Sequence, residues 1–344
     1  MSGMKHSTIK IVLRKKLENW LNTINNEEVK EVARENCIVT GGAVTSMLLG
    51  EDVNDYDIYF KTKEATRIIA EYYVHEFNKT KGTLKTGAMR SCNPVVQEKT
   101  IVNCKGISEE RIVLLMQSSG VASESQSEYK YFEHGSEADT DEFIESLGEN
   151  PLYDGFQEDP LTTAEDLIED IKPRSKQVVR EDGRCVSMPS RYRPIFLTDN
   201  AITLSDKIQL VIRFYGMPKE LHDNYDFVHA MCWYNLKEDF LELPQESLQA
   251  ILSKTLIYKG SLYPLASVFR IRKFIERGWR ITAGQLLKIL FQVSQLDLKD
   301  VNVLKEQLLG VDQAYMHELI SVLENTKEKI DTIYLSKVID EIFE

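Results

Sequence analysis

The stretch IVTGGAVTSMLLGEDVNDYDIYF, residues 38–60, organises the whole chain. A short β-prone run ends at Gly41-Gly42, about two turns of apolar helix follow, and a further glycine ends that helix. A second β-prone run then carries Asp55 and Asp57. Because side chains alternate between the two faces of a strand, residues two apart point the same way, and these two carboxylates are predicted to lie side by side.

This pattern predicts a site for a divalent cation and a phosphate. Two carboxylates held close together repel each other unless a cation lies between them, and Mg²⁺ is held by one or two carboxylates plus substrate phosphates. A glycine pair lets backbone N–H groups approach a phosphate closely, and the positive end of the following helix favours an anion. We therefore expect Asp55 and Asp57 to hold Mg²⁺ or Mn²⁺, and Gly41-Gly42 to contact nucleotide phosphates. The alternative is an ordinary loop in which glycine makes the turn and aspartate acts as a cap.

The same stretch resembles the catalytic head of the poly(A) polymerase and tRNA CCA-adding branch of the polymerase-β-like nucleotidyltransferases. That family has Gly-Gly, a helix ending in Leu-Leu-Gly, a short spacer and Asp-x-Asp on a strand. These elements stand here at Gly41-Gly42, Leu48-Leu49-Gly50, Asp55 and Asp57. The resemblance implies that both aspartates are catalytic metal ligands. One departure is Thr45-Ser46, which stands where the family has Arg-Asp, so the contact that the arginine makes in those enzymes is not implied here.

A second resemblance to this family lies in PKELHDNYDFVHAMCWYN, residues 218–235. Asp226-Phe227 and Ala230-Met231 match the family's element, whereas Asn224-Tyr225 replaces its arginine pair and one residue is missing between. In the family this element helps to hold the incoming nucleotide, so Asp226 and His229 are candidate nucleotide contacts. The alternative is that Asp226 caps the helix that follows it.

The stretch YPLASVFRIRKFIERGWRI, residues 263–281, resembles the neck helix of the same enzymes. The residues that carry this resemblance are Pro264, Arg270, Lys273, Phe274, Gly278 and Trp279. Proline suits the first turn of a helix and glycine ends one. Arg270, Lys273 and Arg277 have helical spacing and share one face, which suits a triphosphate or a nucleic-acid backbone. We therefore expect Arg270 and Lys273 to contact triphosphate or acceptor; a solvated surface stripe is the alternative.

Two other parts of such an enzyme are not specified by the sequence. A third metal carboxylate would have to be Asp206 or Asp226, unless the site works with two. The family's base-selecting element, Glu-Asp with an arginine one turn later, is not found before the neck, and the nearest segment, 249–259, contains no acid. Neither the base nor the acceptor is therefore defined.

Composition limits the class of protein. The chain has 344 residues and 5 cysteines without C-x-x-C spacing, which disfavours a zinc site or disulfide framework and indicates a reducing cytoplasm, that of the host if the protein is viral. No apolar run approaches the roughly 18 residues of a membrane span. The net charge of −12 is unusual for a nucleic-acid-binding protein. However, residues 124–170 hold 16 acidic residues against Lys130 alone, which leaves +3 for the remainder.

The predicted fold class is α+β with two domains. Residues 1–235 are expected to form a nucleotidyltransferase head, a mixed sheet with flanking helices that include a helical cap over 8–36. Short β-prone runs within 84–117 are expected to extend this sheet, and later strands complete it after an acidic, mostly loop insertion over 120–175. Residues 236–344 are expected to form an all-helical neck and body.

The functional hypothesis is a metal-dependent nucleotidyltransferase that moves a nucleoside monophosphate from an NTP to an acceptor hydroxyl. By family analogy the acceptor is RNA, such as a tRNA 3′ end, and no membrane partner is expected. One rival is a toxin- or defence-type nucleotidyltransferase that modifies a protein or small molecule, which the weak basic character and the missing base-selecting element favour. A second rival is a binding or structural protein that kept the fold and lost catalysis. The acidic insertion and partial motifs suit a viral or phage protein.

Overall fold

The computed structural model describes most of the first 300 residues. The described residues are 3–80, 92–102, 108–118, 178–179, 185–186, 191–298, 300, 303–304 and 307. The acidic insertion predicted over 120–175 and the last part of the helical region predicted over 236–344, residues 308–344, lie outside these residues.

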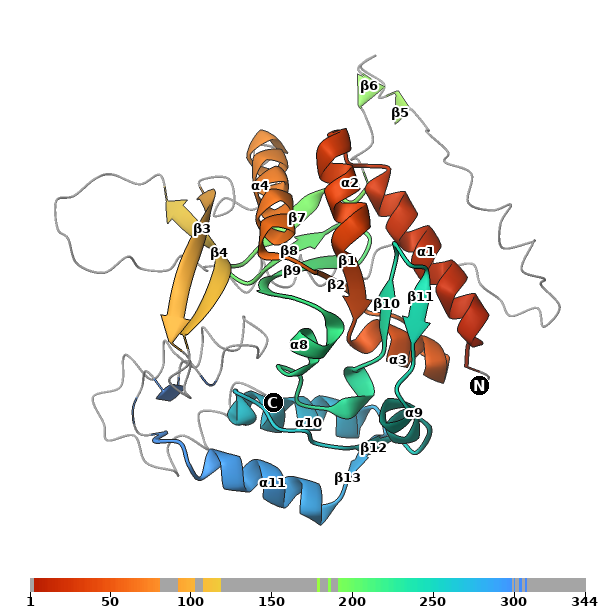
Figure 1. Cartoon of the computed structure of the whole chain (residues 1–344), viewed down its shortest axis with the longest axis vertical. Coiled ribbons are helices and arrows are strands. Elements are labelled where there is room, and N and C mark those ends of the chain that lie inside the picture. The colour runs from red at the N-terminus through yellow and green to blue at the C-terminus, as the bar shows by residue number, and fades with distance from the viewer. Residues whose placement is uncertain are drawn as a thin grey trace.

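A mixed sheet of seven strands forms the centre of the molecule, in the order β11-β10-β1-β2-β9-β8-β7. The strands are β1 (Cys37–Thr40), β2 (Tyr56–Phe60), β7 (Pro194–Leu197), β8 (Ala201–Leu204), β9 (Ile208–Tyr215), β10 (Trp233–Asn235) and β11 (Phe240–Glu242). β2 and β9 run parallel, and the other neighbouring strands run antiparallel. The α+β class and the mixed sheet are confirmed, and strands from both sides of the predicted insertion meet in this sheet (Figure 1).

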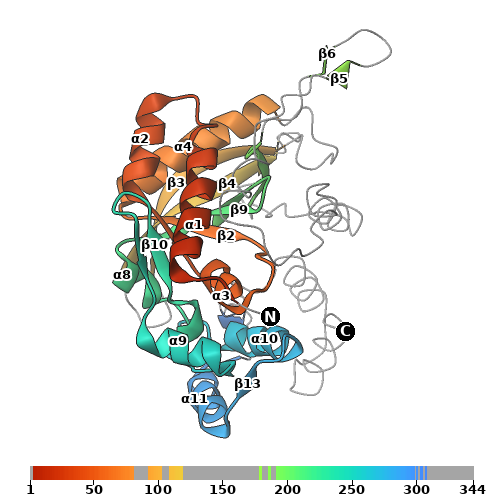
Figure 2. The same ribbon diagram turned by 90° about the vertical axis from the view of Figure 1, so that its right-hand side faces the viewer.

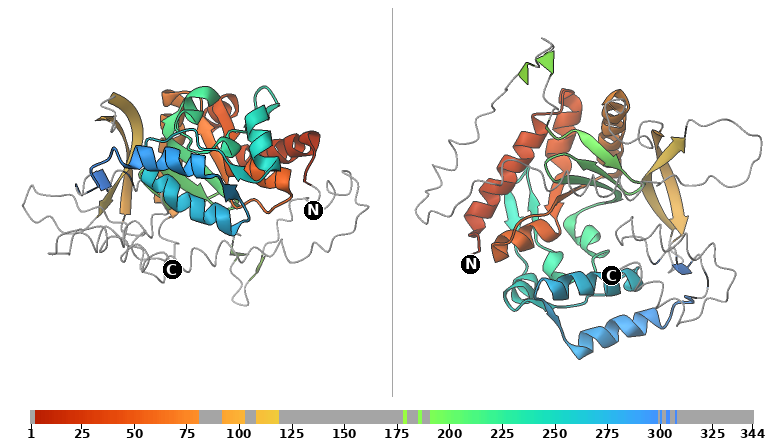
Figure 3. Two further views of the ribbon diagram at one scale, coloured as in Figure 1. Left: turned by 90° about the horizontal axis from the view of Figure 1, so that it is seen from below. Right: turned by 180° about the vertical axis from the view of Figure 1, so that it is seen from behind.

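Helices contact this sheet and extend beyond one end of it (Figure 2). They are α1 (His6–Leu21), α2 (Glu27–Asn36), α3 (Gly42–Leu49), α4 (Lys63–Thr80), α8 (Pro218–His222), α9 (Gln245–Leu252), α10 (Pro264–Glu276), α11 (Ala283–Val293) and the 3₁₀ helix η2 (Val228–Ala230). α1, α2 and α4 gather at one end of the molecule, whereas α9, α10 and α11 gather at the other (Figure 2). Seen from below, α10 and α11 lie side by side (Figure 3).

The main core follows from strand alternation. Cys37, Val39, Ile58 and Phe60 alternate along β1 and β2, are fully buried, and share one apolar cluster with the buried faces of α1 and α4. Each such side chain contributes about 1.5–3 kcal/mol when buried. The residues between them point to the opposite face of the sheet, where Asp57 lies. The core therefore fixes which face carries the polar site.

The hairpin β3 (Cys92–Val102) and β4 (Ser108–Ser118) corrects one prediction. These two strands pair antiparallel with each other in a separate sheet, so the expectation that this part of 84–117 extends the central sheet is wrong. The physical reason is that the hairpin of β7 and β8 occupies the place beyond β9. β3 and β4 instead lie across the surface of α4 and β9, where the Leu114 N–H donates to the Asp199 carbonyl at 3.3 Å.

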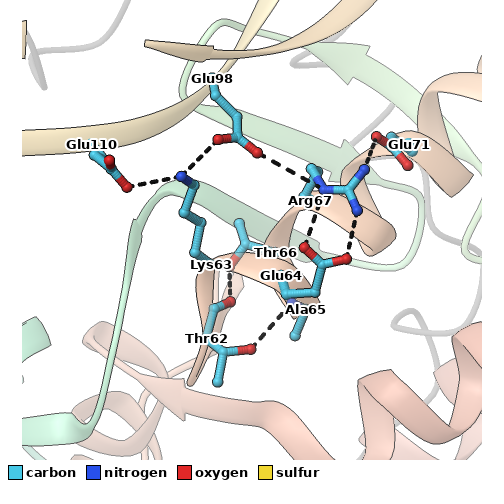
Figure 4. Close-up of polar contacts among 9 residues, drawn as sticks. All are labelled: Thr62, Lys63, Glu64, Ala65, Thr66, Arg67, Glu71, Glu98 and Glu110. Atoms are coloured by element: carbon cyan, nitrogen blue, oxygen red, sulfur yellow. Dashed lines mark hydrogen bonds and ion pairs between the residues drawn. The ribbon is translucent and has the colours of Figure 1, made fainter. Parts of the chain in front are cut away.

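A charged network joins this hairpin to α4 (Figure 4). The Lys63 Nζ lies 2.6 Å from Glu98 Oε2 and 2.8 Å from Glu110 Oε2, so one lysine bridges both strands. Arg67 contacts Glu98 at 3.9 Å and two glutamates on its own helix. Exposed ion pairs contribute about 0–1 kcal/mol each. The network therefore orients the hairpin more than it stabilises the fold.

The expectation of an all-helical region after residue 235 is wrong within the described residues. β11 is an edge strand of the central sheet, and β12 (Thr255–Leu256) pairs parallel with β13 (Arg280–Ile281). Strands this short carry too few residues to show a period of two. β5 (Val178–Val179) and β6 (Cys185–Val186) form a further two-stranded sheet. Within the described part of the chain, none of the helices has the length and apolar character required to cross a membrane.

Candidate functional site

Asp55 and Asp57 lie at the start of β2, in the middle of the central sheet. Asp55 directly precedes the strand and Asp57 is its second residue. The Tyr56 N–H donates to the Lys207 carbonyl at 2.8 Å, which fixes the start of β2 against β9. The charge of Asp55 acts on Asp57, so the two carboxylates lie near each other, which agrees with strand alternation. The same alternation adds Tyr59 to this face, a residue that the sequence argument overlooked.

The turn between β1 and α3 lies directly against the Asp57 carboxylate. Gly41 has φ +103°, a conformation that side chains disfavour, and a Cβ added there would lie 2.9 Å from Asp57 Oδ2. Gly42, the first residue of α3, has open space where its Cβ would be. No side chain caps the start of α3. The positive end of the α3 dipole is therefore open to an anion beside the two carboxylates.

The two carboxylates repel each other in a desolvated place. Although the Asp55 residue is exposed as a whole, burial of its carboxyl raises its pKa, and the charge of Lys273 on α10 partly opposes this rise. Burial and the charge of Asp55 together raise the pKa of Asp57 well above its ordinary value. A divalent cation would remove this repulsion, so the donor set fits Mg²⁺ or Mn²⁺. Among the described residues no cluster of three or more metal-ligating side chains is found.

Neither candidate for a third carboxylate joins this pair. Asp206 Oδ1 lies 3.3 Å from Arg191 Nη2, and its Oδ2 accepts from the Tyr192 N–H at 3.4 Å. The residue beside Asp57 in the register of β2 and β9 is Gln209. The amide oxygen of Gln209 would be a neutral metal ligand, so a cation bound here would have two acidic ligands.

Asp226 and Arg270 bind each other. Arg270 Nη1 on α10 donates to Asp226 Oδ2 at 2.6 Å, and Asp226 is 8% exposed. The nucleotide contacts predicted for both residues stay predictions, and the pair itself connects α10 to the segment before η2. Lys273, one turn further along α10, is the predicted basic residue whose charge acts on Asp55.

His229 lies inside an aromatic cluster. Its ring centroid is 4.6 Å from that of Phe274 and 4.4 Å from that of Trp279, and the residue is 2% exposed. Burial lowers its pKa to about 4. The nucleotide contact predicted for His229 stays a prediction, because a ligand would reach this ring only if α10 moved away.

Thr45-Ser46, the departure from the resembled motif, connects three elements. Thr45 Oγ1 donates to the His229 carbonyl at 2.8 Å, and Arg277 Nη2 donates to Ser46 Oγ at 3.4 Å. Both residues are buried. They therefore attach α3 to η2 and to the end of α10, which explains small hydroxyl side chains at these two positions.

A clamp on Glu51 holds the loop that leads to Asp55. Lys254 Nζ lies 2.7 Å from Glu51 Oε1, and Arg277 Nη2 lies 2.8 Å from Glu51 Oε2. These three residues are far apart in the sequence, so no local pattern could have revealed the contact. The clamp fixes the end of α3 and the approach to the carboxylate pair.

The two glycines of the turn give a sharp prediction. Gly41→Ala is expected to lower the free energy of unfolding by about 1–3 kcal/mol, because its φ is unfavourable for alanine and the added Cβ meets Asp57. Gly42→Ala is expected to leave stability unchanged or slightly higher. If the helix start binds phosphate as the sequence predicts, the added Cβ should weaken nucleotide binding about tenfold by filling the space there. Urea unfolding and calorimetric titration measure the two effects. Equal stability losses in both variants would contradict this account.

Removal of the Asp226 carboxylate is also expected to be costly. Asp226→Asn replaces the carboxylate of a nearly buried ion pair by a neutral amide, so the free energy of unfolding should fall by about 1–3 kcal/mol. The matched control is Asp223→Asn, since Asp223 is 64% exposed and pairs with Lys259 at the surface. Its loss should be below about 0.5 kcal/mol. Urea unfolding of both variants checks the difference. Comparable losses would mean that the Asp226–Arg270 pair stabilises the fold no more than the exposed Asp223–Lys259 pair.

Fold and site together define an α+β protein with a paired-carboxylate site beside a glycine turn. The family that matches this chain is described as Gabija anti-defense 2 family protein, and it covers residues 11–254. The chain belongs to this family. The expectation from sequence resemblance, membership of the polymerase-β-like nucleotidyltransferases, is therefore wrong. No curated protein and no solved structure matches the chain. The matched residues include both aspartates and the glycine turn, and they end before α10.

Proposed function

We propose that this protein counteracts Gabija defence during phage infection, and that it does so as a metal-dependent nucleotidyltransferase acting on a protein of the defended cell. The counter-defence role rests on the family to which the chain belongs. The enzymatic role rests on one observation, the neighbouring carboxyl groups of Asp55 and Asp57 with raised pKa values, of which Asp57 lies against the turn at Gly41. Paired acidic groups with raised pKa values are costly to fold, and such groups concentrate at functional sites.

Each residue of the site would have a separate role in the reaction. Asp55 and Asp57 would hold the cation, and the start of α3 at Gly42 would bind the phosphates of an NTP. A bound divalent cation would supply Lewis-acid stabilisation of the charge that develops on the phosphates. Lys273 adds positive charge on the side of Asp55. The hydroxyl oxygen of the acceptor would bond to the α-phosphorus, the bond to the β-phosphate would break, and pyrophosphate would leave while the hydroxyl proton passes to solvent.

A protein acceptor is favoured over RNA for two reasons. The chain lacks a base-selecting element before α10, and the strongest basic candidate for a nucleic-acid contact, Arg270, is paired with Asp226. A counter-defence protein must also inactivate a component of the defence, and a nucleotidyl group on a serine, threonine or tyrosine hydroxyl adds charge and bulk to that component.

A non-catalytic binding protein is the second candidate. It is favoured by the pairing of Asp226 with Arg270 and by the neutral Gln209 beside Asp57, since both reduce the number of groups available for a reaction. In that case the carboxylate pair would bind a cation or a basic partner without turnover.

The deciding experiment combines infection and labelling. Wild type, Asp57→Asn and the matched surface control Asp52→Asn are expressed in cells with Gabija defence, and phage plaques are counted. Asp52 lies in the same loop and is exposed. The purified proteins are then incubated with each α-labelled NTP, Mg²⁺ or Mn²⁺, the Gabija proteins and bulk RNA. We expect label on a Gabija protein, and plaques, with wild type and Asp52→Asn only.

Each other outcome selects a different function. Label on RNA would show that the acceptor is a nucleic acid and not a protein. Plaques without any label, and with Asp57→Asn as effective as wild type, would establish the binding protein. Loss of plaques in all three proteins would overturn the counter-defence role.

A further inference from the structure

Two buried arginines converge beneath the start of α10, away from the carboxylate pair. Arg111 on β4 is 5% exposed and Arg213 on β9 is 6% exposed. Arg111 Nη2 donates to the Tyr263 hydroxyl at 3.4 Å, and Arg213 Nη2 donates to the same oxygen. Three separate elements therefore bring two positive charges to one neutral hydroxyl group.

The two arginines of this cluster differ in their hydrogen bonds. Arg111 donates to Glu109 Oε2 through Nε at 3.1 Å and Nη2 at 2.5 Å, so it has a carboxylate partner. Arg213 forms its side-chain hydrogen bond with Tyr263, and its buried Nε has no hydrogen-bond partner among the described residues. The carboxylates of Asp199 and Glu109 act on Arg213 through their charge, and no hydrogen bond to either is found among the described residues, so a buried N–H donor stays unsatisfied, which is costly. An arrangement that accepts this cost is expected to have an anion as its ligand.

The backbone and the neighbouring rings aim Arg213 in a defined direction. The N–H groups of Ile212 and Arg213 both donate to the Asn200 carbonyl, at 3.0 and 3.2 Å, which is the pattern of a β-bulge. The Arg213 guanidinium lies 5.0 Å from the ring centroid of Phe214 and 4.9 Å from that of Tyr263. Cation–π contacts hold the plane of the guanidinium but provide no hydrogen-bond acceptor. The bulge and the rings thus present the fork of donors ready for an oxyanion.

We propose that Arg111, Arg213 and the Tyr263 hydroxyl form a binding site for a phosphate group, either free or at the end of a nucleotide. Phosphate oxygens would accept from Arg213 Nε, which has no hydrogen-bond partner among the described residues, and the charge of Arg111 would add to the attraction. Arg213 lies four residues along β9 from Gln209, the partner of Asp57 in the register, which is a separation on the order of 10 Å. The site is therefore separate from the carboxylate pair. It needs no metal and does not depend on the proposed function.

Calorimetric titration in EDTA tests the site without any contribution from bound metal. The probes are inorganic phosphate, AMP and adenosine, of which adenosine is the control without phosphate. Wild type is expected to bind AMP and not adenosine, and binding of free phosphate as well would show that the nucleoside is dispensable. Arg213→Met should weaken binding at least about tenfold. Arg272→Gln, at an exposed arginine of α10, should bind as wild type does.

Thermal melting separates a ligand site from a structural cluster. In phosphate-free buffer Arg213→Met should melt at the same temperature as wild type or higher, because an unsatisfied buried N–H donor is gone, and phosphate should no longer raise its melting temperature. Arg213→Lys keeps the charge without the fork and should respond only weakly. The proposal is overturned if wild type binds neither phosphate nor AMP, or if Arg213→Met binds both normally. Intact phosphate binding with an inactive carboxylate pair would defeat the proposed function alone.

Discussion

Asp57→Asn is expected to lose nucleotidyl transfer by about 10³-fold or more while the protein becomes more stable. On the proposed function, the loss follows because one of the two carboxylates that would hold the cation is gone. Charge stabilisation by a metal in phosphoryl transfer is worth several kcal/mol, and about 1.4 kcal/mol corresponds to each factor of ten in rate. The gain follows because burial and the neighbouring Asp55 destabilise the ionised Asp57. An amide of the same shape removes that repulsion, so the free energy of unfolding should rise by roughly 1 kcal/mol.

Thermal melting with and without Mg²⁺ tests the second half of this prediction. Wild type should be stabilised by Mg²⁺, because a ligand that binds only the folded state raises its stability, whereas Asp57→Asn should respond far less. Asp52→Asn should behave as wild type in every assay. A variant that melts lower than wild type, or that keeps full transfer activity, would show that the carboxylate pair is a structural feature.

The turn and the two aspartates could be predicted because each of them depends on neighbouring residues. A double glycine between a β-prone run and an apolar helix predicts β1, the turn and α3, and strand alternation predicts the shared face of Asp55 and Asp57. The structure adds the physical reason for Gly41, since Asp57 Oδ2 occupies the space that a Cβ would need. The same local logic predicts α10, where Pro264 opens the helix and Gly278, with φ +78°, follows its end.

Contacts between distant residues could not be predicted in this way. Whether β3 and β4 join the central sheet depends on which strands already occupy its edge. The sequence of the hairpin itself does not predict this. The two contacts of the clamp on Glu51 join residues 203 and 226 positions apart. The hydrogen bond from Thr45 to the His229 carbonyl spans 184 positions. The sequence predicts a ligand contact for Arg270 from the resemblance to the neck helix and from helical spacing, whereas its ion pair with Asp226 is seen only in the folded chain.

The resemblance failed as a statement of family for a related reason. It rested on one short motif and two partial ones, whereas the family match extends over residues 11–254. A turn that binds phosphate beside paired carboxylates is a physical solution that different proteins can use. Function must therefore be argued from the site itself, and a shared motif supports the chemistry more than it supports ancestry.

Acidification is expected to destabilise this protein through two buried histidines. Burial, with a contribution from Lys259, lowers the pKa of His222 to about 4, and burial lowers that of His229 to about 4. The unfolded chain binds a proton at each histidine below about pH 6.5, whereas the folded chain does not until pH 4, so the free energy of unfolding falls between these values. Each histidine accounts for roughly 3 kcal/mol, and the loss is complete below the lower pKa.

Substitutions that remove each titration separate these two contributions from those of the many carboxylates. His229→Phe keeps an aromatic ring between Phe274 and Trp279, and His222→Gln keeps a group able to bond the Thr40 hydroxyl, which lies 2.9 Å from His222 Nε2. Urea unfolding at pH 7, 5.5 and 4 should show a smaller loss on acidification in each variant than in wild type, and the smallest in the double variant. If wild type and double variant lose stability in parallel, both histidines are protonated in the folded protein, and the tight aromatic packing around His229 must open at mildly acidic pH.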